Sequence, residues 1–143
     1  MAQGTAALFN EYSEEVARGT HAWATHVYKI ALITTLPVIT QTTPTLSDFT
    51  VVTGGSYASV TATVSISRVL AQTTIDITNN PTWSQDGSGP TNIRAALIYN
   101  DTDASDKAVG FIDMTTDSGT TPVSMQAGDV SLTFNASGFT TIG

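Results

Sequence analysis

The feature that most constrains the fold is a strict two-residue alternation over residues 57–70. Apolar side chains occupy one set of alternate positions (Val60, Ala62, Val64 and Ile66) and hydroxyl side chains occupy the other (Thr61, Thr63, Ser65 and Ser67). Successive side chains of a β-strand point to opposite faces, so this pattern predicts a strand with one face in the core. The four hydroxyl residues, called the hydroxyl row below, are the candidate interface with a partner. The alternative is an ordinary solvated sheet face.

The composition supports a β protein. The chain has 26 threonines and 13 serines, together 39 of its 143 residues, whereas charged residues make up only 12%. Soluble domains contain roughly 25% charged residues. Threonine is β-branched and stiff at χ1, so it suits a pleated surface better than a helix. The length is that of a single domain.

Six further segments read as strands, because apolar runs are separated by turns rich in Gly, Pro, Asn and Asp. They are residues 25–34, 73–78, 92–99, 108–114, 129–135 and 139–142. Strands of this number and spacing predict a mainly β fold, an antiparallel β-sandwich or jelly-roll-like domain over residues 25–143.

One short α-helix is predicted in an N-terminal segment, residues 1–24. Leu8, Tyr12 and Val16 recur at helical spacing, which favours a helix over about residues 6–18. Thr5 is the expected N-cap, and Gly19 is the expected residue after the helix.

The charge pattern excludes several partners. Five basic residues stand against twelve acidic ones, for a formal net charge of −7, and the basic residues form no cluster. Nucleic-acid binding requires cations that displace counterions from phosphate, so we expect no direct contact with DNA or RNA. No apolar run approaches the roughly 20 residues that span a bilayer, and we expect no membrane partner.

The residues that most often carry catalysis are scarce. The chain has no cysteine and two histidines, His21 and His26, which flank Trp23 in what we expect to be an exposed loop. Their spacing of five does not match the i, i+4 spacing of a zinc-binding helix. We therefore predict that the protein is not an enzyme and has no cofactor.

An acidic turn is the main candidate for a metal site. Asp101, Asp103 and Asp106 supply the oxygen ligands that calcium prefers. The segment is not an EF-hand, because Asp106 and Ile112 stand where that loop needs glycine and glutamate. A solvated turn is the simpler interpretation. With the aromatic residues Trp23, Trp83 and Tyr57 as stacking candidates, these aspartates define an alternative function, a non-viral calcium- or carbohydrate-binding β module.

Several segments resemble a known family when they are taken together. They are residues 94–102 (RAALIYNDT), 108–113 (AVGFID) and 128–139 (GDVSLTFNASGF), and in the N-terminal half residues 28–34 (YKIALIT), Pro37, residues 45–52 (TLSDFTVV) and 54–57 (GGSY). The combination resembles a family of small tailed-bacteriophage virion proteins of the head decoration, or cement, type. The chain departs from that family in a threonine-rich stretch over residues 40–45.

The resemblance implies a structural role in a virion. A capsid decoration protein folds as a compact β domain, forms a homotrimer and binds the major capsid protein across capsomer junctions on the outer surface of the capsid. A net charge of −7 suits that outer surface better than the inner one, which faces DNA. The first residues show no secretory signal pattern, so we expect assembly in the host cytoplasm. A tail-tube or head–tail connector component is the alternative within a virion.

Overall fold

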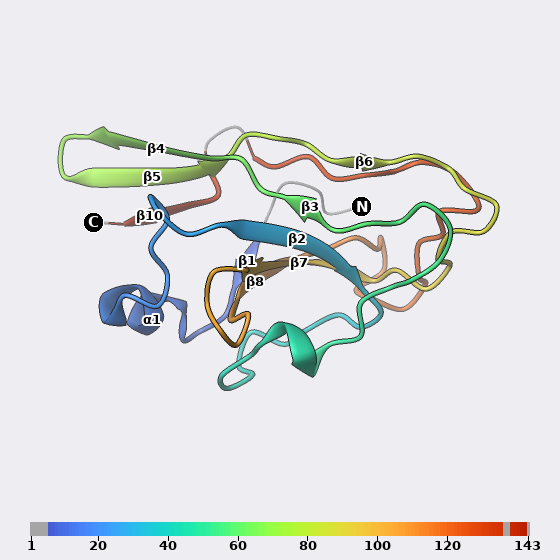
Figure 1. The fold of residues 1–143 in the computed structure, drawn as a ribbon, viewed down its shortest axis with the longest axis horizontal. Coiled ribbons are helices and arrows are strands. Elements are labelled where there is room, and N and C mark those ends of the chain that lie inside the picture. The colour runs from blue at the N-terminus through green and yellow to red at the C-terminus, as the bar shows by residue number, and fades with distance from the viewer. Residues whose placement is uncertain (1–5, 136–137, 143) are drawn as a thin grey trace.

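The computed structural model describes residues 6–135 and 138–142, and in these residues the chain is mainly β, as predicted (Figure 1). A five-stranded sheet has the order β1-β8-β7-β2-β3. Its strands are β1 (Ala7–Leu8), β8 (Ala108–Asp113), β7 (Ala95–Asn100), β2 (Tyr28–Ile33) and β3 (Val60–Thr61). A three-stranded sheet contains β10 (Thr140–Ile142), β5 (Gln72–Ile77) and β4 (Val64–Val69), and a two-stranded sheet pairs β6 (Thr82–Trp83) with β9 (Val130–Ser131). These strand pairs are all antiparallel.

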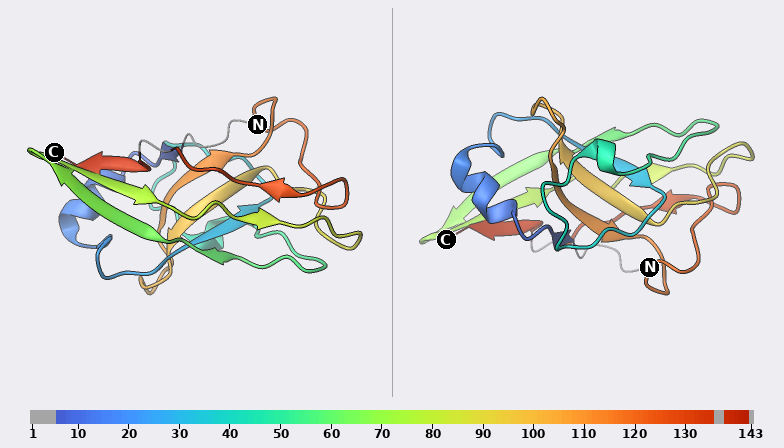
Figure 2. Two further views of the ribbon diagram at one scale, coloured as in Figure 1. Left: turned by 90° about the horizontal axis from the view of Figure 1, so that it is seen from above. Right: turned by 90° about the horizontal axis from the view of Figure 1, so that it is seen from below.

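The sheets are stacked like a sandwich. Figures 1 and 2 show the two smaller sheets over one face of the five-stranded sheet. The larger core cluster fills the space between them, where Ile30 and Ile98 lie in the same cluster as Ile75 and Trp83. The opposite face of the five-stranded sheet is covered by the segment of residues 34–56, which includes the short 3₁₀ helix η1 (Leu46–Asp48). The central strands β2 and β7 are thus buried on both faces, which explains their continuous apolar runs.

The predicted helix is shorter than expected. Helix α1 covers Tyr12–Arg18, and Glu11, not Thr5, is its N-cap residue; Thr5 lies outside the described residues. Gly19 ends the helix with φ +82°, as predicted. Residues 7 and 8 form β1 instead of a first helical turn, because the edge of β8 satisfies their backbone groups.

Glycine is required at one point of this edge. Gly110 lies opposite Leu8 in the pairing of β1 with β8. A Cβ atom at this position would lie 2.6 Å from the carbonyl oxygen of Ala7, so any larger residue would push β1 away. The described part of the N-terminal segment is therefore joined to the five-stranded sheet, and Tyr12 and Trp23 belong to the core.

The alternating segment of residues 57–70 is divided between two sheets. After β3, the amide of Ala62 donates to the carbonyl of Tyr28 on β2 (2.8 Å), and the carbonyl of Thr63 then accepts from Thr78 beyond β5 (2.9 Å). The side-chain amide of Asn79 bridges the change of partner, because it donates to Thr61 O (2.9 Å) and accepts from Thr63 N (2.7 Å).

The prediction of a core face holds for only part of this segment. Ala62 is buried and Val64 is half-buried, but Ile66 is 45% exposed. The reason is that β4 and β5 form a hairpin that extends beyond the core at one end of the molecule (Figure 1). Periodicity identifies the two faces of a strand but does not say how far the core extends beneath them.

The remaining strands lie within a few residues of their predicted positions, with one exception. Residues 129–135 form only the two-residue strand β9, after which Leu132 donates to the carbonyl of Pro81 outside the regular ladder. Among the described residues, no helix combines the length and the apolar character needed to cross a bilayer.

Candidate interaction surface

All four residues of the hydroxyl row are exposed. Thr61 belongs to β3, the last strand of the five-stranded sheet, and Ser65 and Ser67 belong to β4, the last strand of the three-stranded sheet. The row therefore follows one continuous edge that runs across both sheets. Short hydroxyl side chains lose less rotamer entropy than Lys or Glu when they are buried, so such an edge can be covered by a partner at modest cost.

The backbone of β4 is open along this edge. Val69 lies opposite Gln72 across a two-residue turn, and the register continues without a shift to Val64 opposite Ile77. Hydrogen-bonded pairs alternate along an antiparallel ladder, so the residues at 63, 65, 67 and 69 bond toward β5. The amide and carbonyl groups of Val64, Ile66 and Arg68 point away from it, and no strand of the described chain lies beside them.

This edge has little of the usual protection of an exposed strand. Natural edge strands are blunted by bulges, prolines or charged side chains. The β4 ladder has no bulge and no proline, and Arg68 is its one charged residue. An extended segment of another chain could therefore add to the sheet through main-chain hydrogen bonds.

The turn of the β4–β5 hairpin carries an exposed apolar tip, which sequence reasoning missed. Val69 is 74% exposed and Leu70 is 89% exposed. Leu70 also has φ +55°, a left-handed conformation that Gly and Asn adopt far more readily than Leu. The alternating pattern places both residues at the end of a strand, so the pattern alone did not distinguish an exposed tip from a buried strand end.

The acidic turn does not bring its three aspartates together as a metal site. Asp101 pairs with Lys29 (Oδ2 to Nζ, 3.1 Å), and Asp103 Oδ2 accepts hydrogen bonds from the amide and hydroxyl of Ser105 (3.1 and 2.6 Å). The hydroxyl bond is the main cause that lowers the pKa of the Asp103 carboxyl. The Asp106 amide donates to the carbonyl of Asp103. Within the residues that the structure describes, no group of three or more His, Cys, Asp or Glu side chains is placed to hold a metal ion.

The expectation that His21 is exposed in a loop is wrong. The side chain is buried between Tyr12 and Tyr28, with ring centroids 5.9 and 6.1 Å away, and only 3% of the residue is exposed. Residues 20–26 pack against the end of the five-stranded sheet, and this packing covers the imidazole ring of His21. Burial lowers the pKa of His21 to about 4, so the imidazole is neutral at pH 7.

Asn100, at the end of β7, is the centre of a buried polar network that sequence reasoning did not identify. Its side-chain nitrogen lies 2.8 Å from the carbonyl of Thr20 and 2.9 Å from Nδ1 of His26. Its side-chain oxygen accepts from the amides of Thr102 (3.1 Å) and Asp103 (3.3 Å). The residue is fully buried. It fastens the loop before β2 to the acidic turn, which is a structural role.

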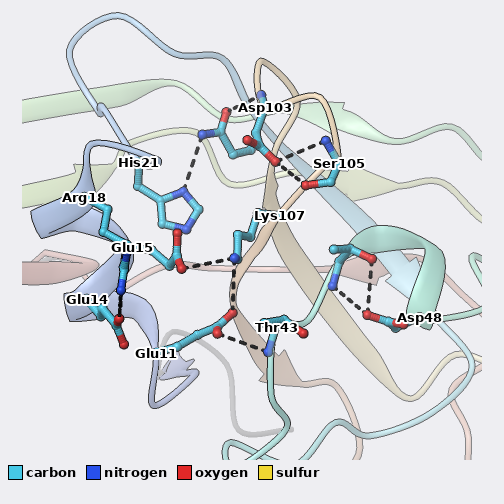
Figure 3. A network of polar contacts seen from close by, with 12 residues as sticks. Glu11, Glu14, Glu15, Arg18, His21, Thr43, Asp48, Asp103, Ser105 and Lys107 are labelled. Carbon is cyan, nitrogen blue, oxygen red and sulfur yellow. Dashed lines mark hydrogen bonds and ion pairs between the residues drawn. The ribbon is translucent and has the colours of Figure 1, made fainter.

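Lys107 connects α1 to the five-stranded sheet (Figure 3). Its Nζ lies 3.1 Å from Glu15 Oε1 and 3.9 Å from Glu11 Oε1, and it is largely covered. A hydrogen bond from Thr20, aided by Lys107, lowers the pKa of Glu15. The polar groups around His21 thus hold α1 and the loop after it against the five-stranded sheet.

Of the aromatic stacking candidates, Trp23 and Trp83 are in the core, and Tyr57 is half-buried and packs against it. Trp23 stacks on Tyr28 with centroids 3.9 Å apart, and its Nε1 donates to the hydroxyl of Tyr12 (2.8 Å). Trp83 is 5% exposed and donates to the carbonyl of Ala58, while the hydroxyl of Tyr57 accepts from the amide of Leu32. Neither indole forms an exposed platform on which a sugar could stack.

In comparisons with known proteins, no family model, no curated protein and no solved structure matches this chain.

Proposed function

We propose that the chain is a structural protein of a tailed-phage virion, a decoration protein that binds the outer surface of the capsid and stabilises contacts between capsomers. The observation that carries this proposal is the hydroxyl row on an unpaired strand edge. An open edge with short hydroxyl side chains is a surface for binding another protein. It agrees with the family resemblance of the sequence.

The partner in this proposal is the major capsid protein, contacted by a homo-oligomer of the chain. The outward backbone groups of Val64, Ile66 and Arg68 offer main-chain hydrogen bonds to an extended segment of that partner. The hydroxyl row lies at the same edge and would supply side-chain contacts. Specificity would come from the side-chain contacts, and affinity would come from the main-chain hydrogen bonds between β4 and the partner segment.

The charge distribution supports the outer rather than the inner surface of a capsid. Lys29 and Lys107 are paired with carboxylates, and Arg18 pairs with Glu14. Arg94 donates to the carbonyls of Gly119 and Thr34. These cations are engaged within the chain, and the net charge of −7 would be repelled by packaged DNA.

A calcium- or carbohydrate-binding module has less support. The aspartates of the acidic turn are engaged in separate contacts, and both indoles are buried. A tail-tube or connector component shares the composition and the β fold, so the location within the particle has to be measured.

The test is to purify virions of the phage that encodes the chain and to label them with an antibody against the protein. Labelling of the head surface of intact particles is the expected result. A Ser65→Lys/Ser67→Lys variant should bind capsids at least ten-fold more weakly while its circular dichroism spectrum stays unchanged. Thr116→Lys, an exposed hydroxyl position away from the row, is the control. Labelling confined to the tail, or absence from virions, would overturn the proposal.

A further inference from the structure

The exposed tip of the β4–β5 hairpin lies outside both core clusters. Leu70 is 89% exposed, Val69 is 74% exposed, and Leu70 adopts a left-handed backbone conformation. Asn or Gly would suit that turn position better in both respects, since they tolerate a positive φ and expose little apolar surface. Exposed apolar residues that occur together mark sites of association.

An apolar groove of about 350 Å³ lies between α1 and β10. Leu8, Tyr12 and Val16 line it from the N-terminal segment, and the residues of β10 line it from the other side, where Ile142 is 41% exposed. A cavity of about 150 Å³ accommodates a benzene molecule, so this groove has room for two aliphatic side chains.

The tip and the groove lie at the same end of the molecule. Ile142 is opposite Thr73 on β5, next to the Gln72 that closes the hairpin. Figure 1 shows α1, β10 and the β4–β5 turn together at one end of the long axis. The ladder holds the hairpin straight up to its turn, so Leu70 cannot bend back into the groove of its own chain.

The charges of the two features are complementary. Residues 60–75 contain one charged side chain, Arg68, and no carboxylate, although the whole chain has a net charge of −7. Beside the groove, Glu14 pairs with Arg18, and Glu11 and Glu15 both lie beside Lys107, so these five side chains together keep one net negative charge. The hairpin is thus a part of this acidic protein that can approach the helix of a second copy without repulsion.

We propose that the hairpin tip, Val69 and Leu70, inserts into the α1–β10 groove of a second copy of this chain. Both features lie at the same end of the molecule. Copies related by rotation about an axis beyond that end can therefore each insert a tip into the groove of a neighbour and receive a neighbour's tip in their own groove. The assembly then closes and does not extend into a filament. This proposal does not rest on the virion role, because self-association is measured on the purified protein alone.

The test is the mass of the purified full chain by size-exclusion chromatography with light scattering. The wild type should have a mass that is a small multiple of 14.9 kDa. Val69→Asp/Leu70→Asp should reduce the mass to that of one chain. Ser13→Arg, which places a long cation at the exposed rim of the groove, should do the same. Val38→Asp, at an apolar position that is 62% exposed elsewhere, is the matched control and should keep the wild-type mass.

Mixing the tip variant with the groove variant tests the pairing itself. The tip variant retains an intact groove and the Ser13→Arg variant retains an intact tip, so the mixture should form a 1:1 complex. Near-ultraviolet circular dichroism checks that each variant is folded. A monomeric wild type, an unchanged mass for either variant, or no complex in the mixture would overturn the proposal.

Discussion

At the scale of single residues, the buried imidazole of His21 links stability to pH. In the unfolded chain a histidine takes up a proton near pH 6.5, whereas burial lowers the pKa of folded His21 to about 4. Between these values the unfolded state binds more protons than the folded state. The free energy of unfolding therefore falls as the pH is lowered through this window.

We expect urea denaturation to show a loss of about 2 kcal/mol between about pH 7 and about pH 5 from this residue alone. His21→Gln should remove most of that pH dependence, because it removes the titrating group. The lowered pKa values of Glu15 and Asp103 act at more acidic pH and do not confuse the comparison. An unchanged slope in His21→Gln would show that another group is responsible.

Asn100 is a second single residue whose substitution should lower the stability of the fold. Asn100→Ala leaves the carbonyl of Thr20 and the amides of Thr102 and Asp103 without their buried partner. We expect a loss of about 2–4 kcal/mol in the free energy of unfolding, measured by urea denaturation at neutral pH. Asn79→Ala removes two hydrogen bonds at a more exposed site and should cost about 1 kcal/mol. Equal losses for the two variants would contradict the assignment of Asn100 as the centre of the network.

At the scale of elements, the β4–β5 hairpin combines a regular ladder with an unfavourable turn residue. The register is continuous over six pairs, yet the first turn residue is a leucine with φ +55°. A left-handed conformation costs a residue with a Cβ roughly 1–2 kcal/mol. The hairpin of an isolated chain is therefore less stable than a hairpin with the same strand pairing and a favourable turn residue would be.

Leu70→Asn should stabilise the monomer by about 0.5–1 kcal/mol, because Asn tolerates the left-handed region better. The comparison is made in the Ser13→Arg background, which is expected to be monomeric, and thermal denaturation gives the difference. Ala71→Asn, at the neighbouring turn position where φ is not positive, is the control and should not stabilise. Equal effects at the two positions would show that the backbone conformation of Leu70 is not the cause.

At the scale of the whole molecule, the described N-terminal segment and the sheets share one core. Trp23 of the segment and Trp83 of the two-stranded sheet belong to the same buried cluster, and Lys107 ties α1 to the five-stranded sheet. Cooperative unfolding in one step is the behaviour expected of a small body built this way.

Single-tryptophan variants test that expectation. Trp83→Phe reports from Trp23, and Trp23→Phe reports from Trp83. In each variant the urea midpoint from tryptophan fluorescence should coincide with the midpoint from far-ultraviolet circular dichroism. An earlier fluorescence transition in Trp83→Phe alone would show that residues 6–24 unfold separately from the sheets.

Much of the fold could be predicted from local pattern. The apolar runs of β2, β7 and β8 and the turns between them place these strands within a few residues of their observed bounds. The start of α1 could not be predicted, because residues 7 and 8 satisfy their hydrogen bonds on β8, a strand that is about a hundred positions away in the chain. Helical spacing in the sequence carries no information about such a distant partner.

The candidate surface was predicted in part. The hydroxyl row was identified correctly as an exposed face, since alternation depends only on the geometry of an extended chain. The sequence by itself thus determined that this is a mainly β chain with a hydroxyl-rich strand face. Only the tertiary structure decided that His21 is buried, that the three aspartates form no metal-binding group within the described residues, and that Val69 and Leu70 lie beyond the core. Burial depends on which distant segments pack over a residue, and that information is not contained in its local sequence.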